Sequence, residues 1–374
     1  MNVQHSAFSL TPFMKIPTVN SQQFDLHWRG TLAEYVTAIA WSPDGQTLAV
    51  SDAAGEVMLW HSDKELDTLQ ASNSASVDCI AFSWDGQFLA VGGQDGRVKV
   101  WRWREHELIA TLENAPAWVD KLAWSPTTNQ LAFSLGRYVQ VWDADTSNID
   151  VTLNFENSSV LGINWCPNGQ YLAIAGYQGA KIWHTQDWNK DPYLIDIPSA
   201  SVAIAWSTDG KYLAAGNIDR TVTVVEMLNL TSLQNSYPWV MRGFPGKIRH
   251  LAWADAQTQL DAPLLASSSI EGIVVWEQAD DNLGWDSRLL HKHTGVVQAI
   301  AFQPGSCLLA SAAEDGRLCL WHKGKRLAQI LDHAKSGLSC LAWHPQGRQI
   351  AAASQEGELL IWSKATRGEG LGRR

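Results

Sequence analysis

Apolar and polar residues alternate along the chain in short runs that predict β-strands rather than helices. Residues 293–321 contain three such runs, from Val297 to Phe302, from Leu308 to Ala312 and from Leu318 to Trp321. These runs are rich in apolar and aromatic side chains, and a Gln-Pro-Gly and a Glu-Asp-Gly sequence separate them. Because both tripeptides are typical of tight turns, the stretch predicts three consecutive antiparallel strands.

The same pattern occurs eight times, which can be checked on two aromatic positions. The first strand ends at Trp41, Phe82, Trp124, Trp165, Trp206, Trp253, Phe302 and Trp343. The third strand ends at Trp60, Trp101, Trp142, Trp183, Val225, Trp276, Trp321 and Trp362. Most steps are 41 or 42 residues, and Ala precedes the first position in every copy except the fourth, which has Asn164. Repetition near forty residues predicts an array of small sheets.

This repeat resembles the WD40 repeat, whose third strand ends in Trp and follows an Asp-Gly turn. The resemblance covers roughly residues 33–362 and implies an all-β fold, a propeller of four-stranded sheets around a common axis. The last copy has no fourth strand of its own, because the segment after Trp362 is rich in Gly and charge. Residues 24–30 alternate like a strand, so we expect them to supply that strand and close the ring.

Eight copies predict an eight-bladed propeller, and seven blades, the number familiar in this family, are the alternative. Seven would require one copy to be discounted, and the weakest are the fifth, with Val225 in place of Trp, and the sixth, which an insertion interrupts. The expected organisation is a flexible lead-in at residues 1–22, one propeller at residues 23–362 and a flexible tail at residues 363–374.

Three longer connections interrupt the compact pattern, at residues 226–236, 254–262 and 277–287. The resemblance implies that they lie on one face of the ring, on neighbouring blades. Their acidic residues are Asp255, Asp261, Glu277, Asp280, Asp281 and Asp286. They are expected to form either a solvated surface or a docking lobe for a basic partner.

Composition narrows the classes of function. The net charge is -10 and the pI is near 5.5, which disfavours nucleic acid and anionic membrane surfaces as partners. Five Cys without a CxxC spacing indicate free thiols in a reducing compartment. The first residues do not resemble a signal peptide, and there is no run of eighteen apolar residues. We therefore expect a cytoplasmic protein without a membrane segment, monomeric by itself.

One set of polar residues in the seventh copy matches the buried tetrad of the resembled family: His293, Ser311, Asp315 and Trp321. The resemblance implies a structural network that fixes a turn against a strand. Ser, His and Asp also invite a catalytic triad, but there is no G-x-S-x-G elbow, and Ser311 falls in the middle of a strand. Because phosphate-binding and kinase signatures are missing too, we expect neither enzymatic activity nor a cofactor.

A zinc site is the alternative function. The residues that suggest it are His291, His293, His322, His333, His344, Cys307, Cys319 and Cys340. No pair has the close spacing of zinc ligands, and the resemblance places these residues on different faces and strands. Isolated histidines and buried thiols are the simpler interpretation, so no residue is assigned to a metal.

The main functional hypothesis is an interaction scaffold that binds other proteins or peptides. The resemblance implies a top face, formed by the connections that enter the first strands and by those that join the second and third strands. The residues expected there are Tyr35, Trp118, Arg137, Tyr138, Tyr177, Arg220, Lys247, Arg249, Glu314 and Glu356. Aromatic and Arg side chains concentrate binding energy at interfaces, and Trp118 is the strongest candidate.

Overall fold

The computed structural model describes residues 23–62, 66–156, 158–227, 238–258, 262–279 and 284–365. The lead-in expected at residues 1–22 and the tail from residue 366 onward lie outside the described residues. Within the described ranges the chain is almost entirely β-structure, with one 3₁₀ turn, η1 (Trp103–Glu105).

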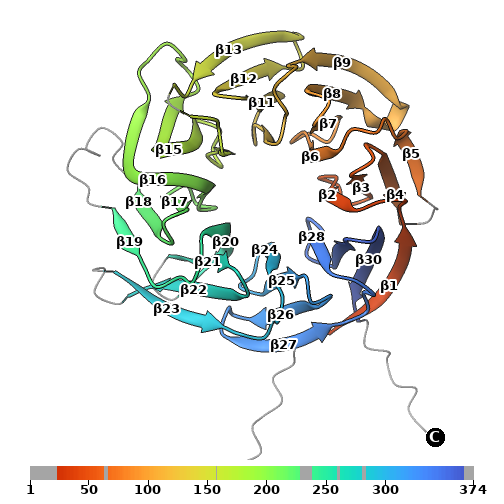
Figure 1. Ribbon diagram of the computed structural model, residues 1–374, viewed down its shortest axis with the longest axis vertical. Coiled ribbons are helices and arrows are strands. Elements are labelled where there is room, and N and C mark those ends of the chain that lie inside the picture. Colours follow the sequence, from red (N-terminus) through yellow and green to blue (C-terminus); the bar gives the residue numbers. More distant parts are fainter. Residues whose placement is uncertain are drawn as a thin grey trace, which may run out of the picture.

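Strands follow one another in antiparallel order around a ring (Figure 1). They are β1 (Phe24–Thr31), β2 (Val36–Trp41), β3 (Thr47–Asp52), β4 (Val57–His61), β5 (Asp67–Gln70), β6 (Val77–Phe82), β7 (Phe88–Gly93), β8 (Arg97–Arg102), β9 (Glu107–Glu113), β10 (Leu122–Trp124), β11 (Gln130–Leu135), β12 (Tyr138–Asp143), β13 (Asn148–Asn154), β14 (Gly162–Trp165), β15 (Tyr171–His184), β16 (Tyr193–Trp206), β17 (Tyr212–Asn217), β18 (Val222–Glu226), β19 (Trp239–Met241), β20 (Ile248–Gln257), β21 (Pro263–Ser269), β22 (Gly272–Gln278), β23 (Trp285–Leu290), β24 (Val297–Phe302), β25 (Leu309–Ala313), β26 (Leu318–His322), β27 (Arg326–Leu331), β28 (Leu338–Trp343), β29 (Gln349–Ser354) and β30 (Glu358–Lys364).

The all-β propeller is confirmed, and the number of sheets corrects the main expectation. The strands form seven continuous hydrogen-bonded sheets, six of four strands and one of six, β14-β15-β16-β17-β18-β19. Counted as sheets, the ring therefore has the alternative number, seven, and the expectation of eight separate four-stranded sheets is wrong. The reason is that the fourth and fifth sequence repeats share one sheet, whereas each of the other six repeats has its own.

The shared sheet arises from two long strands. β16 is a continuous strand of 14 residues: its beginning pairs with β15 as the outermost strand of the fourth repeat, and its end pairs with β17 as the innermost strand of the fifth. β15 folds back on itself, so that its two ends lie side by side. The residues that flank these ends are hydrogen-bonded, with the backbone N–H of Thr185 donating to the carbonyl of Gln170 at 3.0 Å. Both weak copies of the sequence thus contribute strands to the ring, and the missing Trp at Val225 does not prevent it.

The ends of the chain close the ring as expected. β1 pairs antiparallel with β30, from Phe24 opposite Lys364 to Thr31 opposite Glu358, and becomes the outermost strand of the last sheet. β30 extends to Lys364, two residues beyond the predicted end of the propeller. A strand from the beginning of the chain therefore completes a sheet made by its end.

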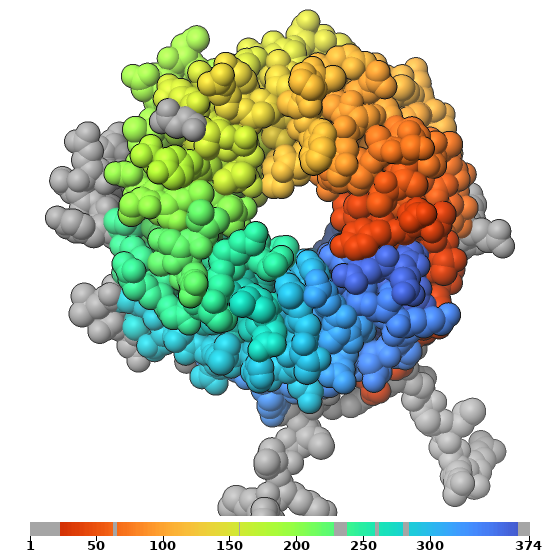
Figure 2. Space-filling model, viewed as in Figure 1, coloured from red at the N-terminus to blue at the C-terminus, as the bar shows by residue number. Residues whose placement is uncertain are grey.

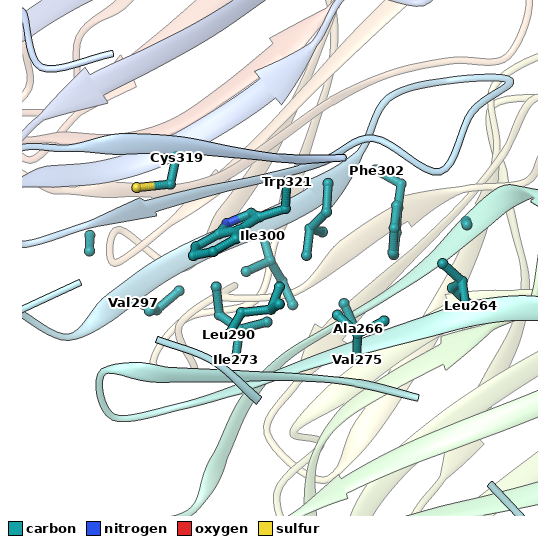
Figure 3. Packing of buried hydrophobic residues seen from close by; sticks show 13 residues of the cluster. Leu264, Ala266, Ile273, Val275, Leu290, Val297, Ile300, Phe302, Cys319 and Trp321 are labelled. Carbon is teal, nitrogen blue, oxygen red and sulfur yellow. The ribbon is translucent and has the colours of Figure 1, made fainter. Parts of the chain in front are cut away.

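Neighbouring sheets pack through apolar faces. Figure 3 shows the contact between the sixth and seventh repeats, where Ile273, Leu290 and Trp321 belong to one buried cluster. Similar clusters lie between the other sheets, and an opening remains at the centre of the ring (Figure 2). Burial of apolar area between sheets is the main source of stability of such a ring.

The first aromatic position of the repeat also connects neighbours by hydrogen bonds. The indole N–H of Trp253 donates to the carbonyl of Ala205 in the preceding repeat at 3.0 Å. The same bond joins Trp41 to Ala342, Trp124 to Ala81, Trp165 to Ala123 and Trp343 to Ala301. Asn164 changes this pattern, because its side-chain oxygen accepts the backbone N–H of Trp206 and the Trp206 indole N–H has no partner among the described residues.

Two of the three expected insertions are largely strand extensions where they are described, whereas most of the first, residues 228–236, lies outside the described residues. Residues 254–257 lengthen β20, residues 277 and 278 end β22, and residues 285–287 begin β23. Trp285 packs against Tyr212, Trp239 and Trp253, with ring centroids 5.5 to 6.2 Å apart. A docking lobe is therefore not apparent in this part, while Asp261, Asp280 and Asp281 lie outside the described residues.

Candidate functional site

The strand order gives the ring two different faces. We call top face the one formed by the loops that lead into each innermost strand and by the turns between the second and third strands of each repeat. The bottom face carries the other turns and connections. The loop that precedes β10 and the turn between β17 and β18 belong to the top face, whereas the turn between β6 and β7 belongs to the bottom face.

Most residues predicted for the top face are accessible. Nine are exposed and Tyr138 is half-buried; the exposed ones are Tyr35, Trp118, Arg137, Tyr177, Arg220, Lys247, Arg249, Glu314 and Glu356. They come from seven repeats, so they lie around the face and do not converge on one pocket. The guanidinium carbon of Arg137 lies 5.8 Å from the ring centroid of Tyr138, which orders that pair.

Trp118 and Tyr177 are the most exposed aromatic side chains of this face. Trp118 is 59% accessible, which shows that its ring does not fold against the neighbouring repeat, and Tyr177 is 52% accessible. Tyr177 also borders an open groove of about 580 Å³ on the outer wall of the fourth repeat, together with Lys181, Leu194 and Asp196. An open groove of this kind suits an extended segment better than an enclosed small molecule.

The tetrad residues form one directed chain of hydrogen bonds. The Trp321 indole N–H donates to Ser311 Oγ at 2.9 Å, and Ser311 Oγ lies 2.8 Å from His293 Nε2. His293 Nδ1 lies 3.2 Å from both carboxylate oxygens of Asp315, which also accept the backbone N–H groups of Thr294 and Arg317. Burial lowers the pKa of His293, and the adjacent Asp315 opposes that shift. Since Ser311 is fully buried, it cannot be presented as a nucleophile.

Other repeats use different partners for the closing Trp. The Trp276 indole N–H donates to Ser267 at 3.0 Å, as in the seventh repeat. Ala352 stands where Ser311 does, and the Trp362 N–H reaches His333 Nδ1 directly at 3.2 Å. In the first and second repeats that position is Val50 and Val91, and the indole N–H groups of Trp60 and Trp101 have no partner among the described residues.

The zinc hypothesis gains no support from the described residues. Within them, no three His, Cys, Asp or Glu side chains gather as a metal site requires. His293 and His333 are engaged as described above, and His344 packs edge-on against Trp41 with ring centroids 5.0 Å apart. Burial raises the pKa of Cys319 to about 12, so this thiol is a poor source of the thiolate that zinc binds.

His250 gives the fold a dependence on pH. It lies on β20, and burial followed by the charge of Arg249 lowers its pKa to about 4 from 6.5. The unfolded chain therefore takes up this proton at higher pH than the folded chain. The contribution of neutral His250 to the free energy of unfolding is therefore complete above about pH 6.5. It is lost as the pH falls toward about 4, because the unfolded chain then binds the proton first.

We therefore expect the free energy of unfolding to be about 1 kcal/mol lower at about pH 5 than at about pH 7, an effect reduced by the partial exposure of the His250 ring. Urea titrations at the two values measure it. His250→Gln should flatten the dependence, although the lowered pKa values of His293 and His344 contribute in the same direction. An unchanged slope in His250→Gln would exclude His250 as its main source.

Several residues of the site were not predicted. Glu358 is buried and accepts the backbone N–H of Lys335 at 2.8 Å, whereas Glu356, the expected acidic residue of that turn, is exposed. Ile218 and Ile270 are exposed on the top face, and Arg242 lies beside the predicted Arg220. In the sequence, Ile218, Ile270 and Arg242 are apolar or cationic residues in turns or loops. They can be recognised only by comparing the equivalent turns of the repeats with one another.

Comparisons with known proteins agree with the fold. The model of the WD domain, G-beta repeat, matches residues 22–61, 63–102, 197–225, 285–322 and 324–363, together half of the chain. Protein CIA1 of Arabidopsis thaliana is 31% identical over 86 residues, which cover 22% of this chain and 24% of that protein. The match thus spans about a quarter of the relative's length. The described part of the chain contains no helix with the length and apolarity needed to cross a membrane. The matched repeats and the ring that they build show that the chain belongs to the WD40 repeat family.

Proposed function

We propose that this protein is a non-catalytic scaffold that binds other proteins or peptides through its top face. The observation that carries the proposal is the accumulation of large apolar side chains that are exposed on the top loops and turns: Tyr35, Trp118, Tyr177, Ile218 and Ile270. Exposed aromatic and aliphatic groups on a rigid support are what interface cores are made of. The closed ring holds these groups at fixed distances, so little order must be gained on binding.

Charge and polarity support a protein partner. The net charge of -10 opposes general binding to phosphate backbones. The top residues come from many repeats, so a partner can lie across the face and contact several anchors at once. Cytoplasmic location and a monomeric state remain predictions of the same proposal.

Trp118→Ala tests the proposal. The amount of protein that co-purifies with the variant should fall at least tenfold, because a desolvated aromatic anchor contributes about 2 kcal/mol or more to binding. Its urea midpoint should stay unchanged, since the ring is largely in solvent. The measurement is affinity purification from the native cell followed by quantitative mass spectrometry.

The matched control is Trp84→Ala. Trp84 is 50% exposed in a turn of the bottom face, so the variant removes the same kind of side chain from the opposite side. Retained partners in Trp118→Ala, or equal losses in both variants, would contradict the assignment of binding to the top face.

A further inference from the structure

Four cations of the top face have no ion-pair partner within the part of the chain that the structure describes. Arg220, Arg242, Lys247 and Arg249, which we call the basic patch, are exposed and make no ion pair with any described residue. Four other cations on the top side of the ring are paired: Arg97 with Glu113, Lys121 with Asp120, Lys181 with Glu156 and Lys335 with Glu358. Exposed Arg137 and Lys292 make no ion pair with a described residue either, but they lie on other repeats. The basic patch thus concentrates four such cations in a chain that carries ten more negative than positive charges.

The fold brings the basic patch together at the junction of the fifth and sixth repeats. Val222 pairs with Met241, so the turn that contains Arg220 lies beside the loop that begins with Arg242. Gly216 lies against Ile248, because a Cβ at residue 216 would be 2.6 Å from Ile248 Cγ2. Lys247 and Arg249 flank Ile248 and are therefore held next to the same turn.

Arg220 occupies a backbone conformation that favours glycine. Its φ is +67°, and the corresponding residue of the seventh repeat is Gly316, with φ +75°. A Cβ at residue 316 would lie 3.0 Å from the carbonyl oxygen of Ser336 in the next repeat, whereas the chain accommodates the whole side chain of Arg220. An arginine kept where glycine would cost less indicates a use for its guanidinium.

The turn that presents Arg220 is rigid. Buried Asn217 accepts the hydroxyl of Ser201 at 2.7 Å and donates to the hydroxyls of Thr221 and Thr223 at 2.9 and 3.1 Å. The Thr221 hydroxyl in turn donates to Asp219 at 2.7 Å. This network fixes the turn, so Arg220 is held in place before any partner arrives.

Apolar groups border the basic patch. Ile218 is 50% exposed in the same turn as Arg220, and Ile270 is 42% exposed and lies over Gly246 in the loop next to Lys247. Two acids, Asp219 and Glu271, are exposed nearby, so the surface remains positive by two charges when all six charged side chains are counted. The surface thus combines excess positive charge with exposed aliphatic area.

We propose that the basic patch, with Ile218 and Ile270, binds an acidic protein segment that carries aliphatic side chains. This inference rests on the proposed function and names the chemistry of the partner. Carboxylates of the segment pair with the four cations, and its aliphatic groups cover the two isoleucines. A polynucleotide carries the negative charge but has no aliphatic side chains to cover the two isoleucines.

The test uses a short fluorescein-labelled peptide in which Glu and Asp alternate with Leu, and a second peptide with Lys in place of the acids. Fluorescence anisotropy should detect binding of the acidic peptide only, weakening as NaCl rises from about 50 to about 300 mM. The pair Arg220→Glu and Arg249→Glu should weaken it at least tenfold. The matched control is Arg326→Glu with Arg348→Glu, two exposed cations of the bottom side, which should leave it unchanged.

Arg220→Gly separates binding from folding. Glycine relieves the left-handed backbone, so this variant should unfold at a higher urea concentration and still bind the acidic peptide more weakly. Equal binding in the top and bottom charge variants, binding of the Lys peptide, or tighter binding of a single-stranded oligonucleotide at the same patch would each overturn the inference. If the acidic peptide does not bind while Trp118→Ala still loses partners, the acidic partner is excluded and the proposed function is unaffected. Retained partners in Trp118→Ala contradict binding through the top face, whatever the peptide does.

Discussion

Replacing Phe24 by alanine should lower the free energy of unfolding by about 4 kcal/mol, the cost of truncating a fully buried aromatic side chain. Phe24 is 1% exposed and belongs to a buried cluster that includes Leu318 of the seventh repeat and Leu338 of the eighth. Its ring meets that of Trp343 edge-on, with centroids 5.5 Å apart. Phe24 therefore anchors the first strand between the last two repeats.

Hydrogen bonds add to this anchor. The Phe24 backbone N–H donates to the side-chain oxygen of Gln329 at 2.9 Å, and its carbonyl accepts the Gln329 amide at 2.7 Å. A cavity at this place weakens the strand that closes the ring, so β1 should also become sensitive to proteolysis. Urea titration and limited proteolysis measure the two effects.

The control for Phe24→Ala is His27→Ala. His27 is exposed on the same strand, so its removal leaves the pairing of β1 with β30 and the buried cluster intact. We expect a change within about 0.5 kcal/mol for this variant. A loss below about 1 kcal/mol in Phe24→Ala would show that closure of the ring does not depend on this contact.

Much of the fold follows from the repeat. The Trp positions identify the ends of the first and third strands because those indoles fill the spaces between sheets and, at five junctions, donate to the preceding repeat. The alternating residues 24–30 identify the closing strand for the same physical reason, since every second side chain must face the core. Patterns of burial could therefore be read from the sequence.

Continuity between strands could not be read in this way. The sequence has Pro198 between the fourth strand of one repeat and the first strand of the next, which suggests a break. In the structure β16 continues through it, because Ala200 pairs with Tyr177 of β15 and extends the ladder. The pair between Tyr177 and Ala200 thus helps to join two repeats into one sheet, and local strand propensity does not predict it.

The candidate site was predictable where it repeats a pattern and not where it departs from one. Aromatic residues in the top loops, such as Trp118, were found because the repeat places them there. The significance of Arg220 depends on its backbone conformation, and that of Glu358 on a neighbouring loop that approaches its carboxylate. Such features depend on the three-dimensional structure, including contacts between repeats. A comparison of the repeats in sequence alone does not show it.

His293→Ala should lower the free energy of unfolding by about 2 to 3 kcal/mol, because it leaves the buried Asp315 carboxylate and the Ser311 hydroxyl each short of a partner. His291→Ala is the matched control: His291 lies two residues away in the same loop and is exposed, so we expect almost no change. Urea titration at neutral pH measures both variants. The Trp321 indole still donates to Ser311 in His293→Ala, which limits the loss, and Ser311→Ala should cost less because it removes no partner of Asp315. Equal stability of His293→Ala and His291→Ala would show that solvent replaces the imidazole, and that apolar packing alone holds the seventh repeat.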